Sequence, residues 1–226
     1  MTSPSTDDTA KKSAGRVGIL VAQLGTPEAP TAAALRPYLR QFLSDPRVID
    51  LHPFKWYPIL YLFVLTLRPR RSAALYKNIW TDEGSPLMIH SKTQTRGLQE
   101  RLGKEYRVIL GMRYGEPSIP AVVDQILGDG VGELFVIPLY PHYAASSYET
   151  AVVRLEEVIQ EKGSKLETTQ MQPFYGDDDY IGALVETARE DLARDYDHLL
   201  MSFHGIPIRH LRKADPSGSH CQVVET

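Results

Sequence analysis

The chain contains one stretch, residues 199–207 (LLMSFHGIP), in which a histidine directly follows an apolar run. An imidazole can accept a proton or hold a metal ion near neutral pH, so His204 is a candidate for either chemistry. Gly205 allows the backbone to turn and Pro207 ends a strand. The pattern predicts a short buried strand that presents His204 at the carboxyl edge of a sheet, where α/β proteins bind ligands. On spacing alone, a turn histidine bonded to backbone remains the alternative.

Three other segments place polar or aromatic residues where a predicted strand ends. They are residues 23–27 (QLGTP), 111–118 (GMRYGEPS) and 138–147 (PLYPHYAASS). Each is explained individually by the glycine and proline that turns require. In a doubly wound sheet, however, all of them would meet at one edge and line a single cleft.

The elements that must position these segments alternate along the chain. Continuous apolar runs predict strands over residues 17–25, 106–112 and 133–139, and a more alternating run predicts an edge strand over 165–172. Helical spacing is found over residues 32–43, 72–80, 87–102, 119–127, 147–162 and 177–194. This alternation predicts an α/β fold with a doubly wound, parallel four-stranded sheet and flanking helices.

Composition excludes several classes of function. The chain has 226 residues, 42% of them hydrophobic, and a net charge of −3, which gives no support for nucleic-acid binding. Its single cysteine, Cys221, can form no internal disulfide and cannot hold an iron–sulfur cluster by itself, so we expect no cluster and a reducing, cytoplasmic location. GxGxxG and Walker A phosphate loops are absent. Residues 1–15 are small and polar, which predicts a disordered tail.

The most apolar run is residues 56–67 (WYPILYLFVLTL), and it is shorter than the roughly 20 residues that span a bilayer. Three arginines follow it: Arg68, Arg70 and Arg71. The run predicts either a core helix or an interfacial helix, because an apolar helix beside basic residues suits a membrane surface.

The motifs MRYGEPSI (residues 112–119) and SFHGIP (residues 202–207) resemble those of the ferrochelatases, which insert ferrous iron into a porphyrin in haem synthesis. The resemblance extends from about residue 17 to residue 222 and includes LGTP, YPHY and the turn at residues 84–87. It implies a chelatase-like fold and a lyase that takes porphyrin and Fe²⁺ as substrates and needs no resident cofactor. The porphyrin would be protoporphyrin IX or coproporphyrin III.

The resemblance also implies roles for particular residues. His204 is similar to the family's active-site histidine, which makes it the expected catalytic residue, as proton acceptor, iron ligand or both. Arg113 and Tyr114 match an Arg–Tyr pair near the pocket floor, where the arginine would hold a propionate or iron-bound water. A structural ion pair is the alternative for Arg113. Leu24 occupies a position that faces the macrocycle, where it would give an apolar contact.

The family has two similar domains, and its second domain supplies a glutamate opposite the histidine. We therefore expect residues 16–174 to form a first domain and residues 175–226 an incomplete start of the second, a C-terminal truncation relative to the family. By itself, the 226-residue chain would have little chelatase activity. The alternatives are a non-catalytic porphyrin-binding remnant and a chelatase for an earlier tetrapyrrole, against which MRYGEPSI argues. The run from Trp56 to Arg71 would contact the inner face of the membrane peripherally.

Overall fold

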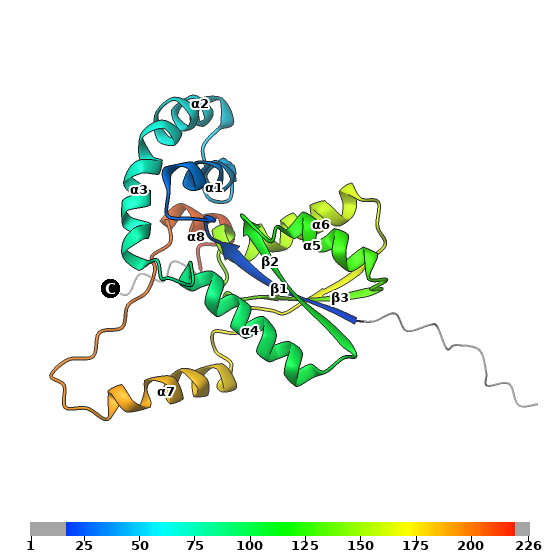
Figure 1. Ribbon diagram of the computed structural model, residues 1–226. Coiled ribbons are helices and arrows are strands. Elements are labelled where there is room, and N and C mark those ends of the chain that lie inside the picture. The colour runs from blue at the N-terminus through cyan, green and yellow to red at the C-terminus, as the bar shows by residue number, and fades with distance from the viewer. Residues whose placement is uncertain (1–16, 220–226) are drawn as a thin grey trace, which may run out of the picture.

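The fold is built on a parallel sheet, as the computed structural model of residues 17–219 shows (Figure 1). The predicted tail (residues 1–15) and Cys221 lie outside these described residues. The strands are β1 (Val17–Gly25), β2 (Tyr106–Tyr114), β3 (Glu133–Pro138) and β4 (Glu167–Gln170). Their order is β2-β1-β3-β4 and every pairing is parallel. The predicted α/β doubly wound sheet is confirmed, including the short β4 at its edge.

Helices cover both faces of the sheet because β1 and β2 are apolar on both sides. One face packs on α5 (Ile119–Gly128) and α6 (Thr150–Glu161). Leu20 of β1 and Val123 of α5 are fully buried in this layer. The other face packs on α4 (Pro86–Leu102), and Met112 is fully buried there. Gly103 follows α4 with φ of +76°, in the left-handed region that a glycine commonly adopts directly after a helix.

A third helical group lies beyond the carboxyl ends of β1 and β2. It comprises α1 (Ala32–Ser44), α2 (Pro53–Ile59), the π-helical turn η1 (Leu60–Val64) and α3 (Leu65–Ile79). Trp56 donates from Nε1 to the carbonyl oxygen of Leu43 at 2.6 Å, and Arg36 donates from Nε to that of Leu65 at 3.1 Å, so the α2–α3 segment is tied to α1. The helix predicted over residues 72–80 is the end of the longer α3.

The apolar run at residues 56–67 is not an ordinary core helix. Only Leu60 and Leu65 are buried, whereas Leu62, Phe63 and Leu67 are 67%, 60% and 68% exposed. Within residues 17–219, no helix has the length and apolarity needed to cross a bilayer. The segment therefore has one face packed on α1 and one apolar face open to its surroundings.

The chain after β4 departs from the prediction. The helix α7 (Asp178–Leu192) projects from the body in Figure 1 and has no buried residue. The strand predicted before His204 is wrong: residues 195–207 contain no strand, and Leu200 is 88% exposed. The short helix α8 (Ile208–Ala214) follows and returns to the body. The division at residue 175 and the start of a second domain remain predictions, because the described part of that region shows two helices and no strand.

Candidate functional site

The carboxyl edge of the sheet contains a point at which neighbouring strands lead in opposite directions. On one side of this point the chain leads from β1 to β2, and on the other side it leads from β3 to β4. Crevices form where adjacent connections diverge in this way, and they are the usual ligand sites of doubly wound sheets. The candidate site therefore lies beyond Gly25 of β1 and Pro138 of β3.

Two glycines allow the ends of β1 and β2 to lie unusually close together. Gly25 has φ of +107°, and a Cβ at this position would lie 1.7 Å from the carbonyl oxygen of Tyr114. Gly115 has φ of +83°, and a Cβ there would lie 2.8 Å from the carbonyl oxygen of Thr26. The LGTP and MRYG motifs thus form one rigid junction. Its outer side is held by a hydrogen bond of 2.8 Å from Thr26 Oγ1 to Ser85 Oγ.

Asp45 lies at the centre of a buried polar network beside this junction. Its Oδ2 accepts from Arg113 Nη2 at 2.6 Å, from the Tyr114 hydroxyl at 2.9 Å and from the Thr150 hydroxyl. Its Oδ1 accepts from the backbone N–H of Arg47 at 2.8 Å. Asp45 is only 4% exposed, so this carboxylate replaces its lost hydration with four donors.

The network shifts the ionisation of its members. Burial raises the pKa of Asp45, but the hydrogen bonds from Thr150 and Arg47, the charge of Arg113 and the Tyr114 hydroxyl together hold it below its ordinary value. For Tyr114, burial is the largest effect and raises the pKa of its hydroxyl. Asp45 is therefore a carboxylate and Tyr114 a neutral donor at neutral pH.

In the structure, Arg113 is mainly the ion-pair partner of Asp45. Besides Asp45, it donates from Nε to the carbonyl oxygen of Thr150 at 3.0 Å and to its hydroxyl at 2.7 Å. Its guanidinium carbon lies 4.5 Å from the centre of the Tyr114 ring. Only 17% of the Arg113 side chain is exposed. Most contacts of Arg113 are therefore those of a structural ion pair, the alternative role that the sequence left open for it.

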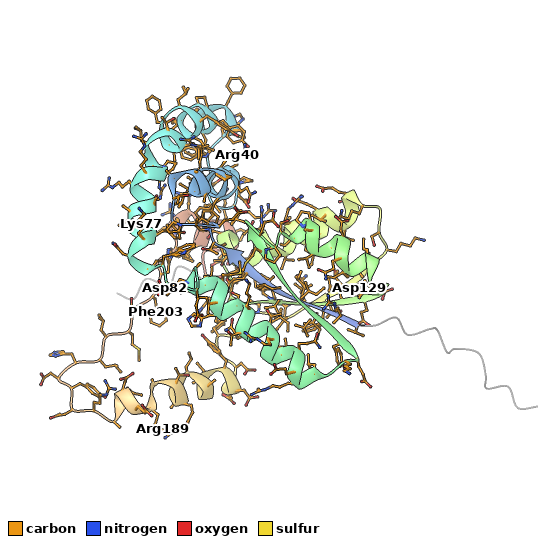
Figure 2. All side chains as sticks on the ribbon, viewed as in Figure 1. Arg40, Lys77, Asp82, Asp129, Arg189 and Phe203 are labelled. Atoms are coloured by element: carbon orange, nitrogen blue, oxygen red, sulfur yellow. The ribbon has the colours of Figure 1, made fainter. Side chains whose placement is uncertain are left out.

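The other predicted site residues lie in different surroundings. Leu24 is half-buried and packs against the apolar cluster of the α1–α3 group that includes Tyr114. Leu24, Arg113 and Tyr114 are thus brought together at one edge of the sheet. His204 is not: it is exposed, on the extended segment between α7 and α8. Figure 2 shows the preceding residue, Phe203, on this segment outside the sheet.

A cavity of about 630 Å³ lies between α8 and the loop that follows β3. Lys213 of α8 contacts Asp50 at 2.6 Å, and His142 stacks on Tyr175 with ring centres 5.3 Å apart. His210 of α8 is 9% exposed, and its Nδ1 has no hydrogen-bond partner among the described residues. Within residues 17–219, His, Cys, Asp and Glu form no group of three or more able to hold a metal ion.

Sequence reasoning missed Asp45, Thr150 and His210. Asp45 precedes a proline, which is typical of a turn, and its partners Arg113 and Thr150 are 68 and 105 residues away in the sequence. No local sequence pattern predicts a pairing between residues this far apart. His210 was distinguishable only as the histidine of a short helical run after the SFHGIP motif.

The order and direction of its strands define an α/β protein of the doubly wound class, in which ligands usually bind beyond the carboxyl ends of the strands. The ferrochelatase family profile matches residues 16–226, and the chain belongs to the ferrochelatase family. It is 45% identical over 208 residues to a ferrochelatase of Opitutus terrae, covering 91% of this chain and 60% of that protein.

Two further relatives give the same result. A ferrochelatase of Pseudomonas syringae pv. syringae is 44% identical over 206 residues, with 90% of this chain and 59% of the relative covered. One of Azoarcus sp. is 43% identical over 218 residues, with 95% and 60% covered. The chain therefore spans about 60% of the length of these curated relatives.

Proposed function

We propose that this chain takes part in inserting Fe²⁺ into a porphyrin for haem synthesis and that it supplies the edge of the sheet on which the porphyrin lies. The observation that carries this proposal is the family match over residues 16–226, which includes both the MRYGEPSI and the SFHGIP motifs. The porphyrin would be protoporphyrin IX or coproporphyrin III.

The surface beyond β1 suits a flat apolar ring with acidic side groups. Leu24 offers an apolar contact beside the junction, and Tyr114 beneath it is fully buried and fixed by Asp45. Arg113 contributes to a porphyrin carboxylate only through the exposed 17% of its side chain, since Asp45 and Thr150 engage its donors. Of the three proposed porphyrin-binding residues, Leu24 and Arg113 would contact the porphyrin directly, whereas the fully buried Tyr114 would support the binding surface from beneath.

Metal insertion requires the porphyrin to lose its two pyrrole N–H protons, while the iron forms bonds to all four nitrogens. A neutral imidazole is the side chain best suited to accept such protons near neutral pH, and His204 is the candidate. Fe²⁺ enters as substrate, and the same nitrogen lone pair can ligate it before transfer. Because residues 195–207 are exposed, the proposal requires this segment to move to the porphyrin or to receive it there.

We further propose that the run from Trp56 to Arg71 makes a peripheral contact with the inner face of a membrane. The support is an open apolar face, with Leu62 and Phe63 more than half exposed, followed by three arginines. A cytoplasmic location accompanies this proposal.

Spectral titration of the purified chain tests the function. Protoporphyrin should change its Soret band on binding, and added Fe²⁺ or Zn²⁺ under anaerobic conditions should then give the metalloporphyrin spectrum at a low rate. His204→Ala should abolish insertion and retain binding, whereas His90→Ala, on the exposed side of α4, should change neither. Binding without insertion by the wild-type chain supports the non-catalytic remnant, and an unchanged Soret band contradicts both functions.

A further inference from the structure

A groove of about 530 Å³ lies between α1 and the π-helical turn η1. It is lined by Arg36, Pro37, Arg40, Tyr61, Leu65 and Thr66. Leu65 is only 5% exposed and gives the groove an apolar floor, whereas its two arginines, the tyrosine and the threonine are exposed at its rim. No carboxylate lines the groove. Its polar rim therefore suits an anionic group.

The two arginines of the groove lie one turn apart on the same side of α1. Arg36 donates from Nε to the carbonyl oxygen of Leu65 at 3.1 Å, which holds its guanidinium beside the groove. Figure 2 shows Arg40 within the group formed by α1, α2 and α3. Among residues 17–219, neither arginine pairs with a carboxylate. Like charges at this spacing repel each other, so a bound anion would remove an uncompensated repulsion.

The positive charge of this helical group extends beyond the groove. Residues 29–81 contain eight basic side chains and two acidic ones, in a chain whose net charge is −3. The two acidic residues, Asp45 and Asp50, are already paired with Arg113 and Lys213. The group of α1–α3 is thus strongly basic, and a surface of this charge is attracted to an anionic membrane.

The residues beside the groove indicate that its anion belongs to a lipid. Leu62 directly follows Tyr61 and is 67% exposed, and Phe54 on the neighbouring α2 is 87% exposed. A free inorganic anion would neutralise the arginines but would leave these apolar side chains in water. A phospholipid supplies a phosphate for the arginines and acyl chains for the apolar residues.

We propose that the groove between α1 and η1 binds the phosphate of an anionic phospholipid between Arg36 and Arg40, with the Tyr61 hydroxyl as a further donor. Guanidinium groups suit this ligand because their N–H groups match the spacing of phosphate oxygens. The inference rests on the proposed membrane contact of Trp56 to Arg71. It adds a headgroup site that includes α1 and a selectivity for anionic lipid.

The test measures binding of the complete chain to phospholipid vesicles by co-sedimentation, without porphyrin. Vesicles that contain phosphatidylglycerol should bind the chain more tightly than vesicles of phosphatidylcholine alone, and raised salt should weaken this preference. Arg40→Gln should lower the affinity for the anionic vesicles by about fivefold, the usual contribution of one basic side chain near such a surface. Arg96→Gln is the matched control, because it removes the same charge from an exposed position on α4 and should leave binding unchanged.

A second variant separates a phosphate site from a diffuse attraction between charges. Tyr61→Phe changes no charge and keeps the ring, so it should lower binding to anionic vesicles by about threefold, the usual effect of losing one hydrogen bond. Tyr57→Phe is its control: the Tyr57 ring lies 6.2 Å from that of Tyr61 but does not line the groove. Circular dichroism should show unchanged helix content in all four variants, since each changes an exposed side chain.

The outcomes distinguish this site from the membrane contact on which it rests. A wild-type chain that binds neither kind of vesicle would contradict both. Equal binding to the two kinds, an Arg40 variant that loses no more than the Arg96 variant, or a Tyr61 variant that binds as the wild type does would overturn the phosphate site alone. Iron insertion plays no part in the measurement, so its outcome is independent of the proposed enzymatic function.

Discussion

Two apolar runs in this chain end with the same pattern of glycine, one residue and proline, yet they have opposite fates. The first ends in Gly25, Thr26 and Pro27 and is β1, an inner strand with partners on both sides. The second ends in Gly205, Ile206 and Pro207 and is an exposed extended segment in which Phe203 is 79% exposed.

The difference between these two regions shows what makes an apolar run a strand. The end of β1 lies against Tyr114, and the neighbouring Asp45 network fixes that end further. Residues 199–203 have similar apolarity, but among residues 17–219 they have no neighbouring strand to satisfy their backbone groups. A strand is a non-local structure, so the same local pattern yields either outcome.

Alanine at the two glycines should give the largest contrast. Gly25→Ala places a Cβ 1.7 Å from the Tyr114 carbonyl oxygen at φ of +107°, so we expect a loss of more than ~4 kcal/mol or no folding at all. Gly205→Ala meets nothing within 4 Å, and we expect a change within ~0.5 kcal/mol. Urea unfolding followed by circular dichroism measures both. Equal effects would show that the two motif ends are equally constrained.

Asp45→Ala should give the next largest effect. It leaves Arg113, Tyr114 and Thr150 without their common acceptor, and breaking such a buried pair costs about 3 kcal/mol or more. Asp129→Ala breaks the surface pair with Arg107 at 3.0 Å and should cost less than ~1 kcal/mol. The urea midpoints of the two variants make the comparison. A loss at Asp45 no larger than at Asp129 would contradict a central role for this network.

Acid should destabilise the protein partly through the same carboxylate. The folded-state pKa of Asp45 lies below its ordinary value of 3.8, so the unfolded chain binds the proton more readily. This stabilisation is complete above the ordinary value and is lost as pH falls through the lower folded-state pKa. Asp45→Asn should therefore flatten the fall of the urea midpoint below about pH 4. An Asp45→Asn variant whose midpoint falls as steeply as that of the wild-type chain would exclude Asp45 as the source.

The difference between local sequence patterns and non-local pairing also explains which sequence-based predictions were correct. The four strands, their parallel arrangement and the edge position of β4 were predictable, because continuous and alternating apolar runs report how many faces are buried. The meeting of Leu24, Arg113 and Tyr114 at one edge followed from that topology. The Asp45 network did not, since it joins residues with no shared local pattern. The strand before His204 failed because its apolar residues predict burial only where a partner is available.

His204→Ala should have the smallest effect on stability. The side chain lies on an exposed segment, so its removal should change the free energy of unfolding by no more than ~0.5 kcal/mol, whereas any metal insertion should be lost. Arg113→Ala is the matching variant beside the end of β1. It should lower the free energy of unfolding, because Asp45 and Thr150 lose a hydrogen-bond donor, and this effect should exceed any effect on porphyrin binding. Urea unfolding and the Soret titration, performed on the same two preparations, separate these effects. A His204 variant that unfolds as readily as the Arg113 variant would show that residues 199–207 contribute to the packed structure after all.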